Sequence, residues 1–208
     1  MTPRESAVLR GLLPAAVGAY EVEITTGDTT LRSFRQREFD AGRACAHAAL
    51  RRTGVEGSVG RHTDRSPAWP RGATGSIAHC RHLAVAVSGP DRQIAGIGVD
   101  VEDESEVHTD LTAVVLTDSE RARLGGAAAA LLPLVFSMKE TAYKCWYPLT
   151  GVALDFVDIE VAFDVGAGTF RATMVTPSRG RPMHVPTHGR FVRHHSHVYA
   201  ATWIEPQL

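Results

Sequence analysis

Residues 131–147 read LLPLVFSMKETAYKCWY, a mainly apolar stretch that carries the charged residues Lys139, Glu140 and Lys144. Apolar residues fall on nearly every side of a helical projection, which is typical of a buried helix. We expect this helix to accept Pro133 in its first turn and to end at Pro148. Glu140 and Lys144 lie four residues apart and share one face. A charged pair on a buried helix needs partners beyond itself, because unpaired buried charge is costly.

Two other segments predict helices. Residues 35–53 favour a helix with a small apolar inner face, and Gly54 supplies a stop signal. Thr117 and Glu120 have the spacing of a capping box, in which each side chain satisfies a free backbone donor at a helix start. A short helix through Leu124 is therefore expected.

The remaining apolar segments predict strands. Residues 157–163 alternate between apolar and polar side chains, as in a strand buried on one face. Two apolar runs, 83–87 and 94–101, are separated by the turn-like SGPD and predict a hairpin. Further strands are expected at 170–174, 190–193 and 197–204. Since strands and helices do not alternate regularly, we expect an α+β fold with mainly antiparallel sheets.

The composition is that of an ordinary globular protein. With 22 basic and 23 acidic residues, the overall charge gives no reason to expect binding to nucleic acid or to an anionic membrane. No apolar run approaches the roughly 20 residues that span a bilayer, and the N-terminus lacks an apolar signal core, so a cytoplasmic location is expected. Cys45, Cys80 and Cys145 are widely spaced, which favours reduced, buried thiols over disulfides or a zinc site.

A second charged motif stands upstream of the long helix. In GVDVE, residues 98–102, Asp100 and Glu102 are two apart and project to the same face of the predicted strand. Paired carboxylate oxygens suit Mg²⁺, which takes one or two protein carboxylates together with substrate phosphate. The alternatives are a solvated strand end for these acids and a surface ion pair for Glu140 and Lys144.

The motifs together resemble a known family. WPRGATGSIAHC (69–80), GVDVE (98–102) and FSMKETAYK (136–144) occur in this order, after a helical block REFDAGRACA (37–46). The combination resembles the 4'-phosphopantetheinyl transferases, and within them the type that activates enterobactin synthase and surfactin synthetase. Two positions depart from the usual pattern, because Ala78 stands where a hydroxyl residue is usual and Thr141 where alanine or serine is usual.

The resemblance implies an architecture. It predicts two similar α+β halves related by a pseudo-twofold axis, each with a small, mainly antiparallel sheet packed with helices. The expected division lies near Asp103, with residues 1–103 in the N-terminal half and 104–208 in the C-terminal half. Coenzyme A would bind between the halves of a monomer, where both can contribute side chains.

The resemblance also implies the site residues. Asp100, Glu102 and Glu140 would hold Mg²⁺ on the pyrophosphate of coenzyme A, while Lys144 contacts that pyrophosphate and Lys139 supports it. Glu140 and Lys144 would be catalytic, with Glu140 as the base. The residues expected to contact coenzyme A are Arg35 and Arg43 at the 3'-phosphate, Arg65, Ser66 and Pro67 at the adenine, His79, Asp100 and Lys144 at the pyrophosphate, and Leu154 nearby.

The implied reaction moves 4'-phosphopantetheine from coenzyme A to a serine of an apo acyl or peptidyl carrier protein of a polyketide or nonribosomal-peptide synthase. The other product is 3',5'-ADP. Val114, Val115 and Leu116 are candidates for apolar contacts with the carrier, and core packing is an equal alternative for them. Two other functions stay open: a non-catalytic coenzyme A binding module and a Mg²⁺-dependent pyrophosphohydrolase.

Overall fold

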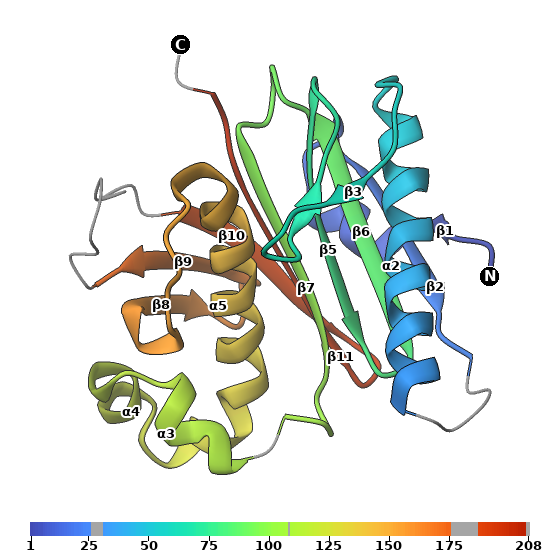
Figure 1. The fold of residues 1–208 in the computed structure, drawn as a ribbon. Helices are drawn as coiled ribbons and strands as arrows, with labels where there is room; N and C mark the ends of the chain where they lie inside the picture. The colour runs from blue at the N-terminus through green and yellow to red at the C-terminus, as the bar shows by residue number, and fades with distance from the viewer. Residues whose placement is uncertain (26–30, 108, 176–186, 207–208) are drawn as a thin grey trace.

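The structure, a computed structural model, describes residues 1–25, 31–107, 109–175 and 187–206. Two antiparallel sheets and two long helices dominate it, with β5 and β7 lying between the helices (Figure 1). The first half contains β1 (Arg4–Glu5), α1 (Ala7–Leu12), β2 (Gly18–Glu23), α2 (Leu31–Arg52), β3 (Gly60–Arg61), β4 (Pro67–Ala68), β5 (Ala73–Cys80), β6 (Leu83–Pro90) and β7 (Gly96–Asp103). It is followed by η1 (Thr109–Leu111), α3 (Thr112–Val115), α4 (Asp118–Leu124), η2 (Gly125–Ala127), α5 (Ala128–Thr150), η3 (Phe156–Asp158), β8 (Ile159–Asp164), β9 (Thr169–Met174), β10 (Thr187–His194) and β11 (His197–Ile204).

The strand order confirms the α+β class with antiparallel sheets. The first sheet has the order β1-β2-β6-β5, the second has the order β7-β11-β10-β9-β8, and β3 pairs with β4 in a small ribbon. Helix α2 packs on β2, β5 and β6, whereas α5 packs on β7 and β11. By its pairing β7 belongs to the second sheet, although the sequence analysis grouped it with the N-terminal half. The division of the chain near Asp103 stays a prediction.

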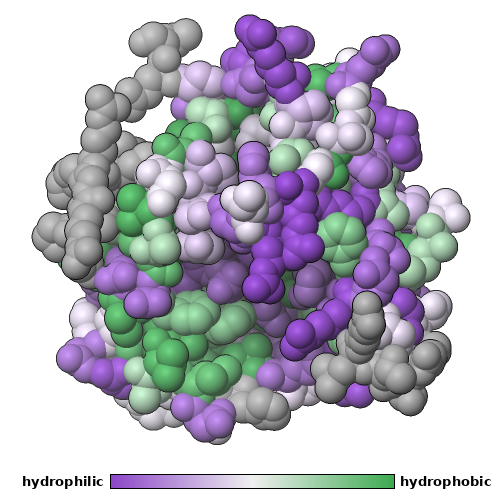
Figure 2. Space-filling model, in the orientation of Figure 1, coloured by the Kyte–Doolittle hydropathy of each residue, from purple (hydrophilic) through white to green (hydrophobic). Residues whose placement is uncertain are grey.

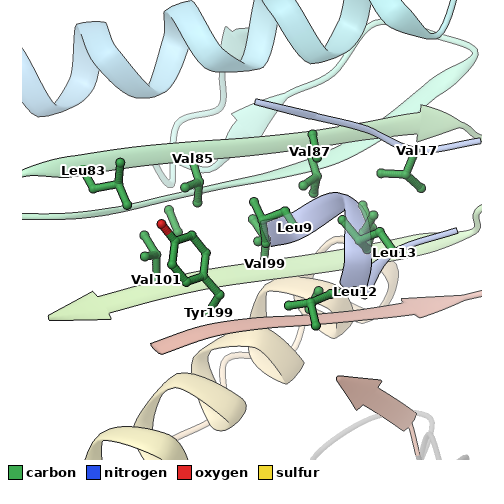
Figure 3. Packing of buried hydrophobic residues seen from close by; sticks show 14 of the residues in the cluster. Leu9, Leu12, Leu13, Val17, Leu83, Val85, Val87, Val99, Val101 and Tyr199 are labelled. Atoms are coloured by element: carbon green, nitrogen blue, oxygen red, sulfur yellow. The ribbon is translucent and has the colours of Figure 1, made fainter. Parts of the chain in front are cut away.

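The predicted hairpin of residues 83–87 with 94–101 is wrong. Strand β6 pairs with β5, and β7 pairs with β11 in the other sheet. The apolar side chains of β6 and β7 instead face each other across a shared core, as Val85, Val87, Val99 and Val101 do beside α1 in Figure 3. The two apolar runs are therefore packing partners, and their similar composition does not distinguish face-to-face packing from hydrogen-bonded pairing.

The helix predictions need one correction. The capping box of Thr117 and Glu120 is confirmed at the start of α4. Helix α5 is longer than expected at both ends, so Pro133 follows its first turn and Pro148 lies inside its last turn. The helix ends instead at Gly151, whose left-handed backbone lets its N–H donate to the Tyr147 carbonyl.

Helix α5 lies directly on β7 because two glycines leave room for it. A Cβ atom added to Gly98 would stand 1.9 Å from the carbonyl oxygen of Thr141, and one added to Gly96 would stand 2.7 Å from Leu149 Cδ1. On the other side of β7, the Val99 N–H donates to the buried Ser76 Oγ of β5 at 3.1 Å. Strand β7 is therefore fixed between α5 and the first sheet.

Two other expectations concern the cysteines and the membrane. Cys45, Cys80 and Cys145 are free thiols in the interior, as the sequence analysis expected. Burial raises the pKa of the Cys145 thiol to about 12, which makes it a poor nucleophile.

Within the described residues, no helix has both the length and the apolar character needed to cross a membrane.

Candidate active site

Two elements from distant parts of the sequence bring acidic and basic side chains together. The Lys144 Nζ of α5 lies 2.6 Å from Asp100 Oδ1 on β7 and 3.8 Å from Glu140 Oε2 one turn earlier on its own helix. Asp100 is only 2% exposed, whereas Lys144 and Glu140 keep about a quarter of their side-chain surface open, at 26% and 28%. The expected convergence of the GVDVE strand with the long helix is therefore present in these contacts.

The carboxylates interact strongly with one another. Burial and, to a smaller extent, the charge on Asp100 raise the pKa of Glu102 to about 9, although Lys144 acts in the opposite direction. Burial also raises the pKa of Glu140, again against the influence of Lys144. Burial alone would lower the pKa of Lys144, but Asp100 and Glu140 outweigh it and raise that pKa. The site thus holds one lysine cation within a group of three acids.

The arrangement differs in one respect from the expected metal site. Among the described residues, no three acidic, histidine or cysteine side chains are grouped so that they could hold one metal ion. The Lys144 ammonium instead lies against Asp100, between the strand and the helix. Asp100 Oδ2 is nevertheless buried without a hydrogen-bond partner. A buried carboxylate oxygen without a partner is costly, so this oxygen fits the role of a cation ligand.

Glu102 gives a prediction about stability and pH. Its folded-state pKa of about 9 lies above the ordinary value of 4.5, so the folded protein loses stability as the pH rises from 4.5 to 9. Glu102→Gln removes this titration. With a metal chelator present, we expect the variant to unfold at a higher temperature than the wild type, by a margin that widens with pH in this window. A margin that is constant or shrinks with pH would contradict the raised pKa.

A pocket of about 320 Å³ opens beside this group of charges. The turn before β4 and strand β5 form one wall, and α5 forms the other. Arg65, Ser66, Pro67 and Lys144 all line it, so the residues expected at the adenine lie close to the lysine expected at the pyrophosphate. In Figure 2 hydrophilic side chains gather at the centre of this face, in the region between α5 and α2.

Two arginines share one aromatic ring on α2. The guanidinium carbon of Arg43 lies 5.1 Å from the centre of the Phe39 ring, and that of Arg61 on β3 lies 5.6 Å from it. Burial lowers the pKa of Arg43, and the charge on Arg61 lowers it further. Two cations held this close form a positively charged patch that would attract an anion. Arg61 was not among the predicted contacts, because its only signal in the sequence is a position four residues before Arg65 in an irregular segment.

Three other residues predicted to contact coenzyme A do not line this pocket. Arg35 is exposed on α2. His79 Nδ1 lies 3.4 Å from Glu38 Oε1, so a carboxylate of α2 faces the ring expected to meet a phosphate. Leu154 is partly buried and packs against the core that contains the apolar residues of α5. The roles of these residues in binding coenzyme A stay predictions. Ala78 is 3% exposed in the central core, where it has no access to a ligand at the surface.

The supporting role expected for Lys139 at the pyrophosphate is wrong. Its Nζ is buried on the opposite side of the helix from Lys144, 2.6 Å from Glu120 Oε2, and donates to the carbonyls of Val115 and Phe156. Neither side chain of this ion pair is exposed. Lys139 therefore ties α3, α4 and η3 to α5 and has no contact with the site, because it lies about 100° around the helix from Glu140.

Comparison with known protein families decides the identity of the chain. A model of the 4'-phosphopantetheinyl transferase N-terminal domain matches residues 32–89, and a model of the 4'-phosphopantetheinyl transferase superfamily matches residues 96–201. The second match covers just over half of the chain and contains Asp100, Glu102, Glu140 and Lys144. The chain belongs to the 4'-phosphopantetheinyl transferase superfamily. The boundary between the two matches falls before β7, in agreement with the pairing of this strand in the second sheet.

Relatives within the superfamily come from several bacteria. The chain is 39% identical to 4'-phosphopantetheinyl transferase Svp of Streptomyces mobaraensis over 69% of its length and 61% of the relative. It is 31% identical to 4'-phosphopantetheinyl transferase Npt of Nocardia iowensis over 70% of both chains. Enterobactin synthase component D of Salmonella typhimurium is 39% identical over 54% of this chain and 48% of its own. The chain thus spans about half to 70% of the length of these superfamily members.

Proposed function

We propose that the protein transfers the 4'-phosphopantetheine group of coenzyme A to a serine of an apo carrier protein and releases 3',5'-ADP. The observation that carries the proposal is the contact of Lys144 with Asp100 and Glu140 beside a pocket lined by Arg65 and Ser66. A nucleotide in that pocket would direct its pyrophosphate towards the lysine and the carboxylates. Membership of the superfamily supports the same activity. We further propose that the protein acts in the cytoplasm as a monomer.

Glu140 and Lys144 would have different roles in this reaction. The serine oxygen would attack the β-phosphorus of coenzyme A, and the bond from that phosphorus to the oxygen of the departing 3',5'-ADP would break. Glu140 is our candidate for the group that accepts the serine proton, because its pKa is raised by burial and it remains partly exposed. Lys144 would stabilise the negative charge that develops on the pyrophosphate.

Mg²⁺ belongs to the proposal as a cofactor. Asp100, Glu102 and Glu140 are the residues that would hold it, since they offer oxygen ligands only and Asp100 Oδ2 has no other partner. When bound, Mg²⁺ would supply positive charge to the pyrophosphate. Lys144 would then be free to pair with the substrate, because the ion would take over its role of neutralising Asp100.

The carrier protein would bind the surface formed by α3 and η3, which the buried Lys139 ties to α5. Of the three residues predicted to make apolar contacts with the carrier, Val115 and Leu116 are buried in the core. Core packing, the alternative role given for them, is therefore the correct one. Val114 is 59% exposed and Val157 of η3 is also exposed. Figure 2 shows a hydrophobic area at the lower left, over this part of the molecule. We propose that Val114 contacts a carrier of the polyketide or nonribosomal-peptide type, which would present an apolar and acidic helix.

One assay tests the function. The protein is incubated with coenzyme A, Mg²⁺ and apo carrier proteins of the fatty-acid, polyketide and nonribosomal-peptide types, and each carrier is weighed by mass spectrometry. We expect one phosphopantetheine to be added to at least one carrier. Release of 3',5'-ADP with all carriers unmodified would indicate a pyrophosphohydrolase. Binding of coenzyme A without either product would indicate a binding module.

Arg61 provides a prediction about the 3'-phosphate. Because Arg61 and Arg43 lie on one ring, Arg61→Ala should raise the KM for coenzyme A about tenfold, as expected for the loss of a charge-assisted hydrogen bond. Dephospho-coenzyme A lacks the 3'-phosphate and should be used equally well by the variant and the wild type. Arg92→Ala, at an exposed arginine between β6 and β7, is the control. An equal loss with both substrates would exclude a 3'-phosphate site at Arg61.

A further inference from the structure

The turn before β4 is tied to the C-terminal part of α5 by a side-chain hydrogen bond. The Tyr147 hydroxyl donates a hydrogen bond to Asp64 Oδ2 at 2.6 Å, across 83 positions in the sequence. Within the described ranges, it is the one side-chain hydrogen bond that joins residues 62–66 to α5. We call this contact the Tyr147–Asp64 clasp.

Both ends of the clasp are held in place by other contacts. Asp64 Oδ1 accepts hydrogen bonds from the Ser66 N–H at 2.9 Å and the Ser66 hydroxyl at 2.7 Å, so Oδ2 is left for Tyr147. The His62 N–H donates to the Ser66 carbonyl and closes the turn. On α5, the Tyr147 ring lies 5.4 Å from that of Tyr143. The Asp64 carboxylate and the Tyr147 ring are therefore each held by a neighbour, although the hydrogen bond itself lies at the surface of the molecule.

The clasp holds a turn with an unusual backbone. Arg65 has a φ of 73°, in the left-handed region that residues other than glycine rarely adopt. It stands between Asp64 and Ser66, the two residues whose side chains fix the turn. Loss of the clasp would remove a restraint next to Arg65, which lines the pocket together with Ser66 and Pro67.

The ionisation of the two partners keeps the clasp intact at neutral pH. The hydrogen bonds from Tyr147 and Ser66 lower the pKa of Asp64 to about 2, so this carboxylate is charged. The bond to Asp64 raises the pKa of Tyr147, so its hydroxyl keeps the proton that it donates. Donor and acceptor thus hold their roles throughout the pH range in which the enzyme would be assayed.

We infer that the Tyr147–Asp64 clasp closes the pocket over the nucleotide end of coenzyme A and that Tyr147 is a positioning residue for substrate binding. The inference rests on the proposed function. Both clasp residues line the pocket, one on each wall, so their hydrogen bond spans it. Neither contacts Asp100 or Glu140, whose ion pairs are with Lys144. The clasp therefore acts on the binding of coenzyme A and leaves the transfer step unchanged.

The test removes the hydroxyl and leaves the ring. For Tyr147→Phe we expect the Kd for coenzyme A by calorimetry and the KM in the transfer assay to rise about three- to tenfold, which corresponds to one hydrogen bond. The kcat at saturating coenzyme A should stay within about twofold of the wild type. Tyr20→Phe, which removes a hydroxyl from β2 outside the pocket, should change neither constant.

A second substitution tests whether the effect passes through the clasp. Asp64→Asn weakens the acceptor, and in the double variant with Tyr147→Phe the Kd should rise no further than in the more affected single variant. An unchanged Kd in Tyr147→Phe, a fall in kcat as large as the rise in KM, or additive effects in the double variant would each overturn the inference while leaving the function standing. Failure of the wild type to bind coenzyme A would overturn both.

Discussion

Glu140→Gln is expected to lower the kcat for transfer of phosphopantetheine about a thousandfold, at saturating coenzyme A and Mg²⁺. Glutamine keeps the shape of the side chain but cannot accept a proton and carries no charge. Glu140 lies 3.8 Å from Lys144 and contributes to the raised pKa values of Lys144 and Glu102, so its charge is part of the whole cluster. Single-turnover assays with a carrier protein would measure the loss directly.

The control for this prediction is the same substitution at another glutamate. Glu160 on β8 forms an ion pair with Arg123 at 3.5 Å, away from Asp100 and Lys144. Glu160→Gln should transfer at the wild-type rate, because surface ion pairs contribute little to stability. Near wild-type turnover of Glu140→Gln under the same conditions would mean that Glu140 is neither the base nor a required ligand of the cation.

Local patterns in the sequence were sufficient to predict the helices and the strand that form or support the candidate active site. The capping box at Thr117, the alternation in β8 and the apolar composition of α5 each depend on neighbours a few residues apart, and all three elements are present. Their bounds differ in two cases, because α5 extends beyond the expected range at both ends and residues 157 and 158 belong to η3, so that β8 begins at Ile159. The spacing of Asp100 and Glu102 likewise predicted that both side chains lie on one face of the strand. In agreement, the charge on Asp100 raises the pKa of Glu102, which requires the two carboxylates to be close together.

Local patterns could not predict which distant strands form hydrogen bonds with each other. The runs that became β6 and β7 are both apolar, so nothing in either one indicates whether they share hydrogen bonds or a core. Local patterns also could not predict which distant side chains contact each other. Lys139 lies next to Glu140 in the sequence, but its buried partner Glu120 belongs to α4. The partners of Arg61 and Tyr147, which are Phe39 and Asp64, are tertiary neighbours and cannot be found from local sequence patterns.

Gly98 shows how a residue without a side chain can govern the site. The motif GVDVE was read for its carboxylates, but its glycine allows α5 to approach β7, and this approach brings Lys144 to Asp100. An added Cβ would lie 1.9 Å from the Thr141 carbonyl oxygen and 3.0 Å from the Cys145 nitrogen, both of them backbone atoms of a buried helix. Such atoms cannot rotate away as a flexible side chain would, so the helix and the strand must separate.

We therefore expect Gly98→Ala to destabilise the protein by more than about 3 kcal/mol and to abolish transfer in any fraction that still folds. Chemical denaturation followed by circular dichroism would measure the first effect, and the carrier assay the second. Gly11→Ala is the matched control, because a Cβ at that exposed position of α1 meets no atom within 4 Å. It should leave stability unchanged or slightly raised, since alanine favours a helix over glycine. A Gly98→Ala variant as stable and active as Gly11→Ala would contradict the close packing of α5 on β7, and with it the geometry on which the proposed active site depends.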